Sequence, residues 1–353
     1  MVQNRERMYL NIVRGIAIVL MMWGHCIQVC GRGAIEVFEN EVFQFIYSFH
    51  MPLFMLLSGY LFYYSYEKRD LKTLLVYKTQ GMLQPIVFAS MLNILLNKFP
   101  TLILHRIFHI TNGELFYGLF SFWFLWCVLS ASIAVAVAGK TVRNPWLRFG
   151  CMILGFGFVS LFQENHYHQY MYPYFVAGFY YGMYRNRIPG WLKKSAWVSL
   201  LIFPWMLRSY NSWNLIYVTP VIIPNLDLAE ALRQNLFRWG IGLAGSLCVL
   251  LITWSLCKRS YKKERTPFWM AWLAKLGENS LAVYCISVSL LTEYLSKFCD
   301  RLFLAMGRNV LADNILIFNF VLTPLMTVLY GFFLYYVVVL MKKLRIHSLI
   351  FGR

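Results

Sequence analysis

Residues 9–30 read YLNIVRGIAIVLMMWGHCIQVC, an apolar stretch that is interrupted by Arg14 and His25. A helix needs about 20 mainly apolar residues to cross the hydrocarbon core of a bilayer, and this stretch is long enough to do so. It is too long for the apolar region of a secretory signal peptide, and no small-residue cleavage site follows it. The stretch therefore predicts a membrane-spanning helix near the start of the chain.

Apolar stretches of this length recur along the 353 residues of the chain. Hydrophobic residues make up 59% of it and charged residues 14%, whereas soluble domains average about 45–50% and about 25%. An ordinary soluble domain is thereby excluded. The predicted fold class is all-α, a polytopic membrane helix bundle that forms a single domain over residues 1–353. About ten membrane-spanning helices are predicted, near residues 8–30, 42–65, 80–97, 115–138, 147–162, 170–184, 195–213, 237–257, 278–298 and 314–341.

The chain carries 33 Lys and Arg against 15 Asp and Glu, a formal net charge of +18. In a soluble protein such an excess would indicate nucleic acid as a partner. Here most basic residues fall in alternate loops between the predicted spans, for example in residues 68–78 and 258–275. Because cytoplasmic loops of membrane proteins are rich in Lys and Arg, this pattern predicts two cytoplasmic termini. It predicts a multi-pass protein in the lipid bilayer of the inner (plasma) membrane and removes the reason to expect nucleic acid.

Arg14 and His25 are ionisable residues inside the first predicted span. Such residues are costly in a bilayer and usually mark a pathway, a site or a structural pair. Their separation of 11 residues is close to three helical turns and about 16.5 Å along the helix axis. The spacing predicts that both side chains lie on one face of the helix, with Arg14 toward the cytoplasm and His25 in the outer half.

A third ionisable residue, His50, lies in the second predicted span at a depth close to that of His25. Pro52 is expected to break the helical ladder near it, and a break is tolerated where the backbone is buried in protein or faces a cavity. Two histidines near such a break suggest a reaction chamber. An intramembrane histidine that simply forms a hydrogen bond between helices is the alternative interpretation.

The eight cysteines form no C-x-x-C pair and have no histidine neighbours at zinc spacing. They are predicted to be buried thiols. No metal site and no permanently bound cofactor are predicted. The sequence also lacks G-x-S-x-G, H-E-x-x-H and P-loop motifs, so a serine esterase, a zinc protease and a nucleotide-driven pump have no support.

Several motifs occur in a defined order along the chain. Arg14 and His25 in the first span are followed by SFHMPLF at residues 48–54, SGYL at 58–61, WFL at 123–125 and LGENSLAVY at 276–284. This order resembles the acyltransferase 3 family of integral membrane acyltransferases, most closely over residues 8–62. The resemblance implies a ten-helix enzyme that moves an acyl group from cytoplasmic acyl-coenzyme A to a hydroxyl of an extracytoplasmic acceptor, commonly a sugar.

The resemblance also implies functional roles for His25 and Arg14. The family's arginine-x-x-arginine pattern after the second helix corresponds here to Arg69 and Lys72, and the lysine keeps the charge but lacks the bidentate fork of arginine. The family often has a histidine where this chain has Ser287, and no role is assigned to that serine.

These residues suggest separate roles in acyl transfer. His25 is the predicted general base, because a neutral imidazole is available near pH 7 to accept the proton of a hydroxyl. Arg69 and Lys72 are the predicted donor-binding cations for the phosphates of acetyl-CoA or another acyl-CoA. Arg14 is predicted either to bind the donor deeper in the protein or to pair with a buried acceptor. The residues predicted to line the chamber or contact the acceptor are His50, Ser58, Trp123 and Asn279.

The glycan acceptor is expected on the outer side, where Trp213 and Tyr217 are candidates to contact sugar rings. Direct transfer is favoured over an acyl-enzyme on His25 or Cys26, because Cys26 lies about 100° around the helix from His25. A secondary transporter or glycan flippase is the main alternative function, and a sensor or assembly scaffold is a third. The sequence leaves the acyl group open between acetyl and succinyl.

Overall fold

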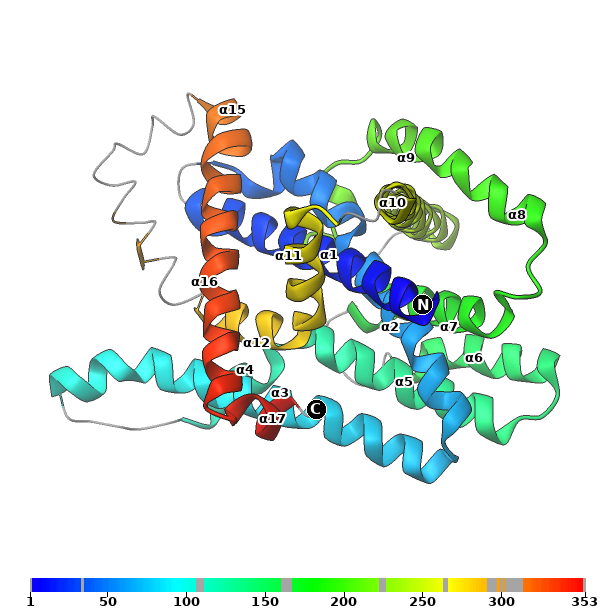
Figure 1. Ribbon diagram of the computed structural model, residues 1–353, viewed down its shortest axis with the longest axis horizontal. Coiled ribbons are helices and arrows are strands. Elements are labelled where there is room, and N and C mark those ends of the chain that lie inside the picture. Colours follow the sequence, from blue (N-terminus) through cyan, green and yellow to red (C-terminus); the bar gives the residue numbers. More distant parts are fainter. Residues whose placement is uncertain are drawn as a thin grey trace. The chain divides into compact units, whose positions relative to one another are not determined.

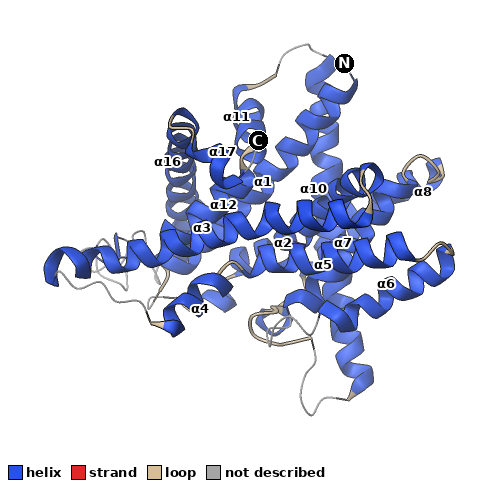
Figure 2. Ribbon diagram, turned by 90° about the horizontal axis from the view of Figure 1, so that it is seen from below, coloured by secondary structure: helices blue, strands red, loops and turns tan. Residues whose placement is uncertain are grey.

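A computed structural model describes residues 2–32, 35–105, 111–159, 167–221, 227–262, 266–290, 297–298, 301 and 314–351. Over these residues the secondary structure consists of helices and turns without strands (Figures 1 and 2). The predicted all-α fold class is therefore confirmed. In the described part of the chain, 6 helices are long and apolar enough to cross a membrane, namely Arg5–Cys30, Glu41–Lys68, Leu71–Lys98, Trp123–Thr141, Ala229–Tyr261 and Ile315–Lys343.

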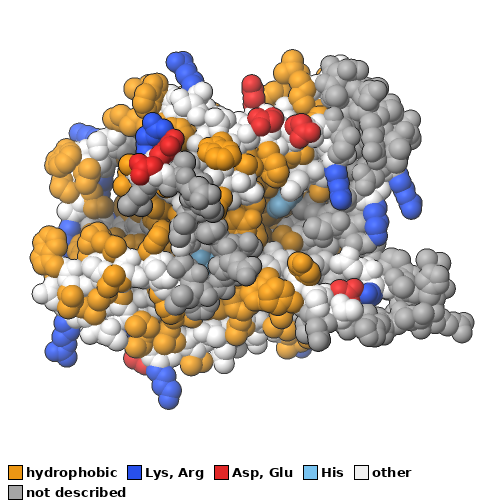
Figure 3. Space-filling model, turned by 180° about the vertical axis from the view of Figure 1, so that it is seen from behind, with side chains coloured by type: hydrophobic (Ala, Val, Ile, Leu, Met, Phe, Trp, Pro, Cys, Tyr) orange, Lys and Arg blue, Asp and Glu red, His pale blue; other side chains and the backbone are white. Residues whose placement is uncertain are grey.

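The surface fits a lipid environment, because hydrophobic side chains cover much of the face seen in Figure 3. Along the C-terminal long helix, Leu325 is 54%, Leu329 57% and Phe333 53% exposed. Their spacing of four residues places them on one side of that helix. An apolar stripe of this kind would be unfavourable in water and is typical of a helix that faces lipid.

The chain divides into two compact units. Unit 1 comprises Met1–Phe43, Gly81–Trp123 and Phe268–Arg353, and unit 2 comprises Gln44–Gln80 and Phe124–Pro267. Helix α3 (Leu71–His105) contributes its first part to unit 2 and its second part to unit 1. The remaining helices of unit 1 are α1 (Val2–Cys30), η1 (Val37–Glu39), α4 (Asn112–Phe120), α11 (Phe268–Glu278), α12 (Ser280–Leu290), α15 (Ile315–Ile317), the π-helix η6 (Phe318–Leu322), α16 (Thr323–Lys343) and α17 (Ile346–Phe351).

Helix α1 forms the core of unit 1, where it packs against α11, α12 and α16. Its closest neighbour is α11, because Gly15 faces the backbone of Leu273 and Gly277 faces the backbone of Asn11. A Cβ atom at either glycine would collide with main-chain atoms. The two glycines therefore allow the backbones of α1 and α11 to touch, as small residues do in membrane helix pairs.

Unit 2 contains α2 (Glu41–Lys68), whose first residues belong to unit 1, and a second crossing of the same kind. Gly59 of α2 faces the backbone of Phe175, and Gly178 faces the backbone of Leu56. The other elements of unit 2 are α5 (Trp123–Thr141), α6 (Pro145–Val159), α7 (Tyr167–Tyr184), α8 (Gly190–Ser195), η3 (Ala196–Val198), α9 (Ser199–Leu207), η4 (Ser212–Asn214) and α10 (Leu228–Lys262).

The helices differ from the predicted spans in several places. The segment predicted as one span at 115–138 is divided by a turn at Ser121 and Phe122 into α4 and α5. The predicted span 195–213 is divided among the end of α8, 3-10 helix η3, the 9-residue α9 and the start of η4. The predicted spans at 147–162, 170–184 and 278–298 correspond to α6, α7 and α12, while residues 160–162 and 291–296 lie outside the described residues. The count of ten spans and the cytoplasmic termini stay predictions.

The predicted break at Pro52 was wrong, since α2 continues as a helix from Glu41 to Lys68. Proline removes one backbone donor from the helical ladder, but the flanking residues keep helical geometry. The ring of Pro52 is also held from outside, because it packs against the bare backbone of Gly242 in α10. The secondary structure of α2 therefore continues past Pro52, although one hydrogen bond is missing there.

Candidate active site

Arg14 and His25 lie on α1, which is a continuous helix between them. Eleven residues differ from three whole turns by about 20°, so the two side chains share one face. Both are partly buried. Among the residues that the structure describes, Arg14 makes no hydrogen bond or ion pair within its unit. A cation in a membrane-spanning helix needs a counter-charge or polar partner, so this guanidinium is suited to hold a ligand.

His25 has a defined orientation because its Nδ1 lies 3.2 Å from Gln28 Oε1, one turn further along α1. The amide oxygen can only accept a hydrogen bond, so Nδ1 carries the proton. In the neutral ring the lone pair is then on Nε2, which is the atom that can act as a base. Cys26, the alternative nucleophile, is completely buried.

The junction between α11 and α12 contacts the turn of α1 that carries Arg14. Gly277 packs on Asn11 and Gly15, and two residues later the buried Asn279 donates from Nδ2 to the carbonyl oxygen of Lys275 at 2.7 Å. The structure therefore brings the predicted Asn279 segment next to the Arg14 turn. The Asn279 side chain itself caps the end of α11, and Trp123 lies partly buried at the start of α5.

A buried polar network in unit 1 was missed by the sequence analysis. Trp23, two residues from His25, donates from Nε1 to Thr323 Oγ1 at 2.9 Å. Asn40 donates from Nδ2 to Asn319 Oδ1 at 2.8 Å, and Asn319 belongs to the π-helix η6. π-helical turns are frequent at functional sites. The sequence signal for this network is the presence of Asn40 and Asn319 in or beside apolar stretches.

The remaining predicted site residues belong to unit 2. His50 is buried, and its Nδ1 donates to the carbonyl oxygen of Ile46 at 2.8 Å, so its neutral ring carries the lone pair on Nε2. The ring centroid of Tyr47 lies 4.6 Å from that of His50. Ser58 donates from Oγ to the carbonyl oxygen of Phe54 at 2.8 Å, beside the crossing at Gly59.

The predicted donor-binding residues lie where α2 ends and α3 begins. The Arg69 guanidinium carbon lies 3.9 Å from the centroid of the Tyr77 ring, whereas Lys72 is exposed. Between them Asp70 accepts a hydrogen bond from the backbone N–H of Thr73 at 3.2 Å. Hydrogen bonding to Thr73 lowers the pKa of the Asp70 carboxyl. Arg69 is therefore held on an aromatic face, which is a favourable cation–π arrangement.

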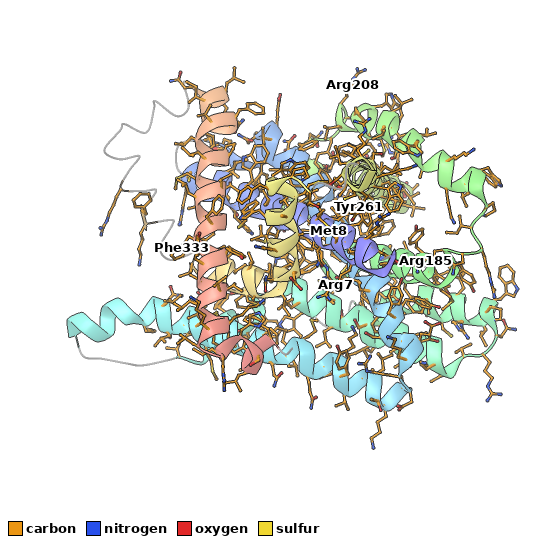
Figure 4. All side chains as sticks on the ribbon, in the orientation of Figure 1. Arg7, Met8, Arg185, Arg208, Tyr261 and Phe333 are labelled. Atoms are coloured by element: carbon orange, nitrogen blue, oxygen red, sulfur yellow. The ribbon has the colours of Figure 1, made fainter. Side chains whose placement is uncertain are left out.

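Three further cations of unit 2 are held in the same way, and the sequence analysis did not assign them to the site. Lys78 lies 5.3 Å from the Phe62 ring centroid and Lys140 lies 4.2 Å from that of Tyr66. Arg185, labelled in Figure 4, donates a hydrogen bond to the Tyr60 hydroxyl. Phe62 and Tyr66 contact each other at 6.3 Å between centroids. We call Arg69, Lys78, Lys140 and Arg185 the basic cluster.

Comparison with known proteins assigns the chain to a family. The family model for the acyltransferase domain of acyltransferase 3 proteins matches residues 7–343. The match covers nearly the whole chain, so the chain belongs to the acyltransferase 3 family. It is therefore a multi-pass membrane enzyme that transfers acyl groups other than amino-acyl groups, and the predicted resemblance is confirmed.

Two curated relatives carry the same name. The chain is 26% identical over 308 residues to "Nodulation protein NolL" of Sinorhizobium fredii, a match over 80% of this chain and 77% of the relative. It is 22% identical over 298 residues to "Nodulation protein NolL" of Mesorhizobium japonicum, over 80% of this chain and 76% of the relative. No solved structure matches the chain.

Proposed function

We propose that this acyltransferase moves an acyl group, with acetyl as the first expectation, from cytoplasmic acyl-CoA to a hydroxyl of an extracytoplasmic carbohydrate. The observation that carries the proposal is the shared face of α1, where Arg14 lacks a partner within its unit among the described residues and His25 has its Nδ1 proton directed to Gln28. Acyl transfer to an alcohol needs a base and a cation for an anionic donor. The two side chains supply both.

The reaction proceeds by direct transfer in this proposal. His25 Nε2 accepts the proton of the acceptor hydroxyl while the hydroxyl oxygen forms a bond to the thioester carbonyl carbon. The tetrahedral intermediate collapses when the carbon–sulfur bond breaks, and the leaving thiolate takes the proton from His25. The products are an O-acylated acceptor and free coenzyme A. Arg14 binds a polar group of the donor along the α1 face.

The basic cluster supports acyl-CoA as the donor. Coenzyme A carries phosphates, and arginine and lysine are the side chains that bind phosphate. Two cations of the cluster share an aromatic ring, because Arg69 and Lys78 both lie over Tyr77. Lys78 lies 5.6 Å from the Tyr77 centroid and also 5.3 Å from the Phe62 centroid. Exposed Lys72 extends the positive surface. In this proposal Arg69 and Lys72 bind the donor phosphates.

The basic cluster also supports the proposed topology. It lies at the end of unit 2 where α2 ends, and cytoplasmic segments are enriched in Lys and Arg. This end is cytoplasmic in the proposal, as are both termini, and the acceptor approaches from the opposite end. The protein is proposed to act as one domain of about ten spans in the inner membrane.

The proposal is tested with purified protein, acetyl-CoA carrying a heavy-isotope acetyl group, and surface polysaccharide from the host cell. Wild type should release coenzyme A and place the label on the polysaccharide, while His25→Gln should do neither. The matched control is His347→Gln, because His347 is a partly buried histidine of the short terminal helix α17. Transfer by His25→Gln at the wild-type rate would contradict the proposed base. Absence of transfer by wild type would instead favour a transporter or flippase.

A further inference from the structure

The first turns of α10 hold a loop of unit 2, residues 210–221, through its main chain. Arg238 donates from Nη2 to the carbonyl oxygen of Trp213 at 2.9 Å and from Nη1 to that of Pro220 at 3.2 Å. Asn235 donates from Nδ2 to the carbonyl oxygen of Val221 at 2.7 Å, and Gln234 donates to that of Trp213 at 3.1 Å. Three side chains of one helix face therefore fix both ends of the loop.

Arg238 is completely buried, and no carboxylate pairs with it in the part of the chain that the structure describes. A buried cation that is neutralised only by carbonyl groups is costly. Here the carbonyl groups of the 210–221 loop provide that compensation, so Arg238 holds the loop in one conformation. Only some side chains of the loop pack into the protein. Leu215 and Tyr210 are buried, whereas Trp213 is 56% and Val218 39% exposed.

Two polar atoms at this loop are buried without a hydrogen-bond partner among the described residues, namely Thr219 Oγ1 and Arg238 Nε. Thr219 is 2% exposed and Arg238 0%. Native proteins satisfy nearly all buried polar groups, so each exception points to a cause such as strain, a functional role or a bound water or ion. The two atoms are a hydroxyl and a guanidinium N–H, which suit the hydroxyl groups of a polar neutral ligand.

A chain of ring contacts connects Tyr217 of the loop to His50. The ring of Tyr217 contacts that of Tyr47 at 5.4 Å and that of Tyr167 at 5.3 Å between centroids. Tyr47 in turn contacts His50 at 4.6 Å. The loop thus combines exposed aromatic area, buried polar atoms and a connection to a histidine that carries its lone pair on Nε2.

From these observations we infer that residues 210–221 form the recognition loop for the sugar acceptor. In this inference the apolar face of a pyranose ring packs on the side chains of Trp213 and Tyr217, and its hydroxyl groups bond to Thr219 Oγ1 and Arg238 Nε. Arg238 is a positioning residue that holds the loop. A lipid chain would fit the exposed aromatics but would leave Thr219 and Arg238 unsatisfied. The inference rests on the proposed function and adds the location of its acceptor.

The test measures acetyl transfer from acetyl-CoA to p-nitrophenyl pyranosides of glucose, galactose, mannose, rhamnose and N-acetylglucosamine, with sugar binding followed by saturation-transfer NMR. For each bound sugar, Trp213→Ala and Tyr217→Ala should raise the acceptor KM about tenfold, which corresponds to about 1.4 kcal/mol. The KM for acetyl-CoA should change less than twofold. Tyr217→Phe keeps the ring and should therefore raise the acceptor KM less than Tyr217→Ala does.

The matched control for Trp213→Ala is Trp205→Ala, because Trp205 is a 69% exposed tryptophan of α9 outside the loop. It should leave the acceptor KM unchanged. Equal acceptor KM values for wild type and Trp213→Ala, or binding of none of the pyranosides by wild type, would overturn the acceptor site. Failure of wild type to consume acetyl-CoA with host polysaccharide would instead overturn the proposed function.

The positioning role of Arg238 is tested with Arg238→Met and Arg238→Lys. Arg238→Met should raise the acceptor KM about tenfold while the KM for acetyl-CoA stays unchanged, and Arg238→Lys should restore part of the loss because it keeps a donor toward the carbonyl groups. A purely structural role would lower the amount of active protein without changing either KM. That result would contradict the role assigned to Arg238.

Discussion

Each unit of the protein carries an arginine inside a long apolar helix, and the two arginines have opposite surroundings. Arg14 of α1 has no hydrogen bond or ion pair within unit 1 among the described residues. Arg238 of α10 is bonded to the carbonyl oxygens of Trp213 and Pro220 and to the side chain of Asn235 in unit 2. The same side chain therefore serves different purposes in the two units.

The difference follows from the cost of a cation away from water. A guanidinium whose donors are bonded to the backbone stabilises that backbone, and its removal leaves carbonyl groups unpaired. A guanidinium without protein partners contributes little to folding, and its removal can even stabilise the protein. Arg14 is thus available for a ligand, whereas Arg238 is committed to the loop that it holds.

Each unit contains one close helix crossing that depends on a pair of glycines. Gly15 and Gly277 let α1 and α11 touch in unit 1, and Gly59 and Gly178 let α2 and α7 touch in unit 2. Both crossings lie beside predicted site residues, Arg14 in one unit and Ser58 in the other. The polar groups, and not the helix packing, therefore distinguish the two units.

The largest effects are expected at these crossings. Gly15→Leu and Gly59→Leu should abolish the monodisperse peak in detergent size-exclusion chromatography, because each new side chain meets backbone atoms that cannot move aside. Gly150→Ala is the control, since a Cβ there meets nothing within 4 Å. It should raise stability by about 0.5–1 kcal/mol, as alanine does in place of a glycine within a helix. A monodisperse Gly59→Leu protein would mean that the crossing in unit 2 is looser than the one in unit 1.

A second test exchanges each arginine for methionine. Arg14→Met should lose transfer activity yet melt at or above the wild-type temperature, because the removed charge has no partner among the described residues of its unit. Arg238→Met should lower the free energy of unfolding by about 1–3 kcal/mol for the carbonyl groups left unpaired. Thermal unfolding of both variants in one detergent is the measurement. A lower melting temperature for Arg14→Met than for Arg238→Met would contradict the conclusion that Arg238 contributes more to stability than Arg14.

A smaller effect is expected at the basic cluster. Arg69→Ala should raise the KM for acetyl-CoA about tenfold, and Lys72→Ala should raise it less, because lysine lacks the bidentate geometry of arginine. The acceptor KM should stay constant in both variants. Arg208→Ala is the control, since Arg208 is an exposed arginine outside the cluster. An unchanged KM for acetyl-CoA in Arg69→Ala would contradict the proposal that the basic cluster binds the donor.

The smallest effect concerns Glu114 of unit 1, which lies outside the membrane-spanning helices. Lys98 Nζ lies 2.5 Å from Glu114 Oε1, and this lysine together with the Thr111 backbone lowers the pKa of Glu114 from 4.5 to about 2. A lowered pKa stabilises the fold above the unfolded value, and this stability is lost as the pH falls toward 2. Glu114→Gln should therefore melt slightly below wild type at pH 7. The difference should shrink below pH 4.5, and a constant difference down to pH 3 would contradict this origin.

The sequence predicts the helical fold class well, because an apolar stretch of membrane length is rarely anything but a membrane-spanning helix. It predicts less about residues whose partners are main-chain atoms. Arg238 follows the first residue of a predicted span and reads as a helix-end cation, since the carbonyl groups of Trp213 and Pro220 leave no trace in side-chain chemistry. Pro52 misleads for the same reason, because the bare backbone of Gly242 that receives its ring cannot be recognised from sequence.

Predictability within the site follows the same rule. The shared face of Arg14 and His25 depends only on helical spacing and could be derived from residue numbers. The addition of Lys78, Lys140 and Arg185 to Arg69 depends on cations from different parts of the chain that meet aromatic rings of α2, which spacing along the chain does not reveal. Local geometry could therefore be predicted, and contacts between distant helices could not.

We propose that the Arg14 and His25 face of α1 carries out acyl transfer to a carbohydrate. The most direct test of this claim is mass spectrometry of surface glycans from cells that express wild type, His25→Ala or His347→Ala at equal membrane levels. An added acyl mass is expected with wild type and His347→Ala, and no added mass is expected with His25→Ala. The same acyl mass in all three samples would contradict the claim.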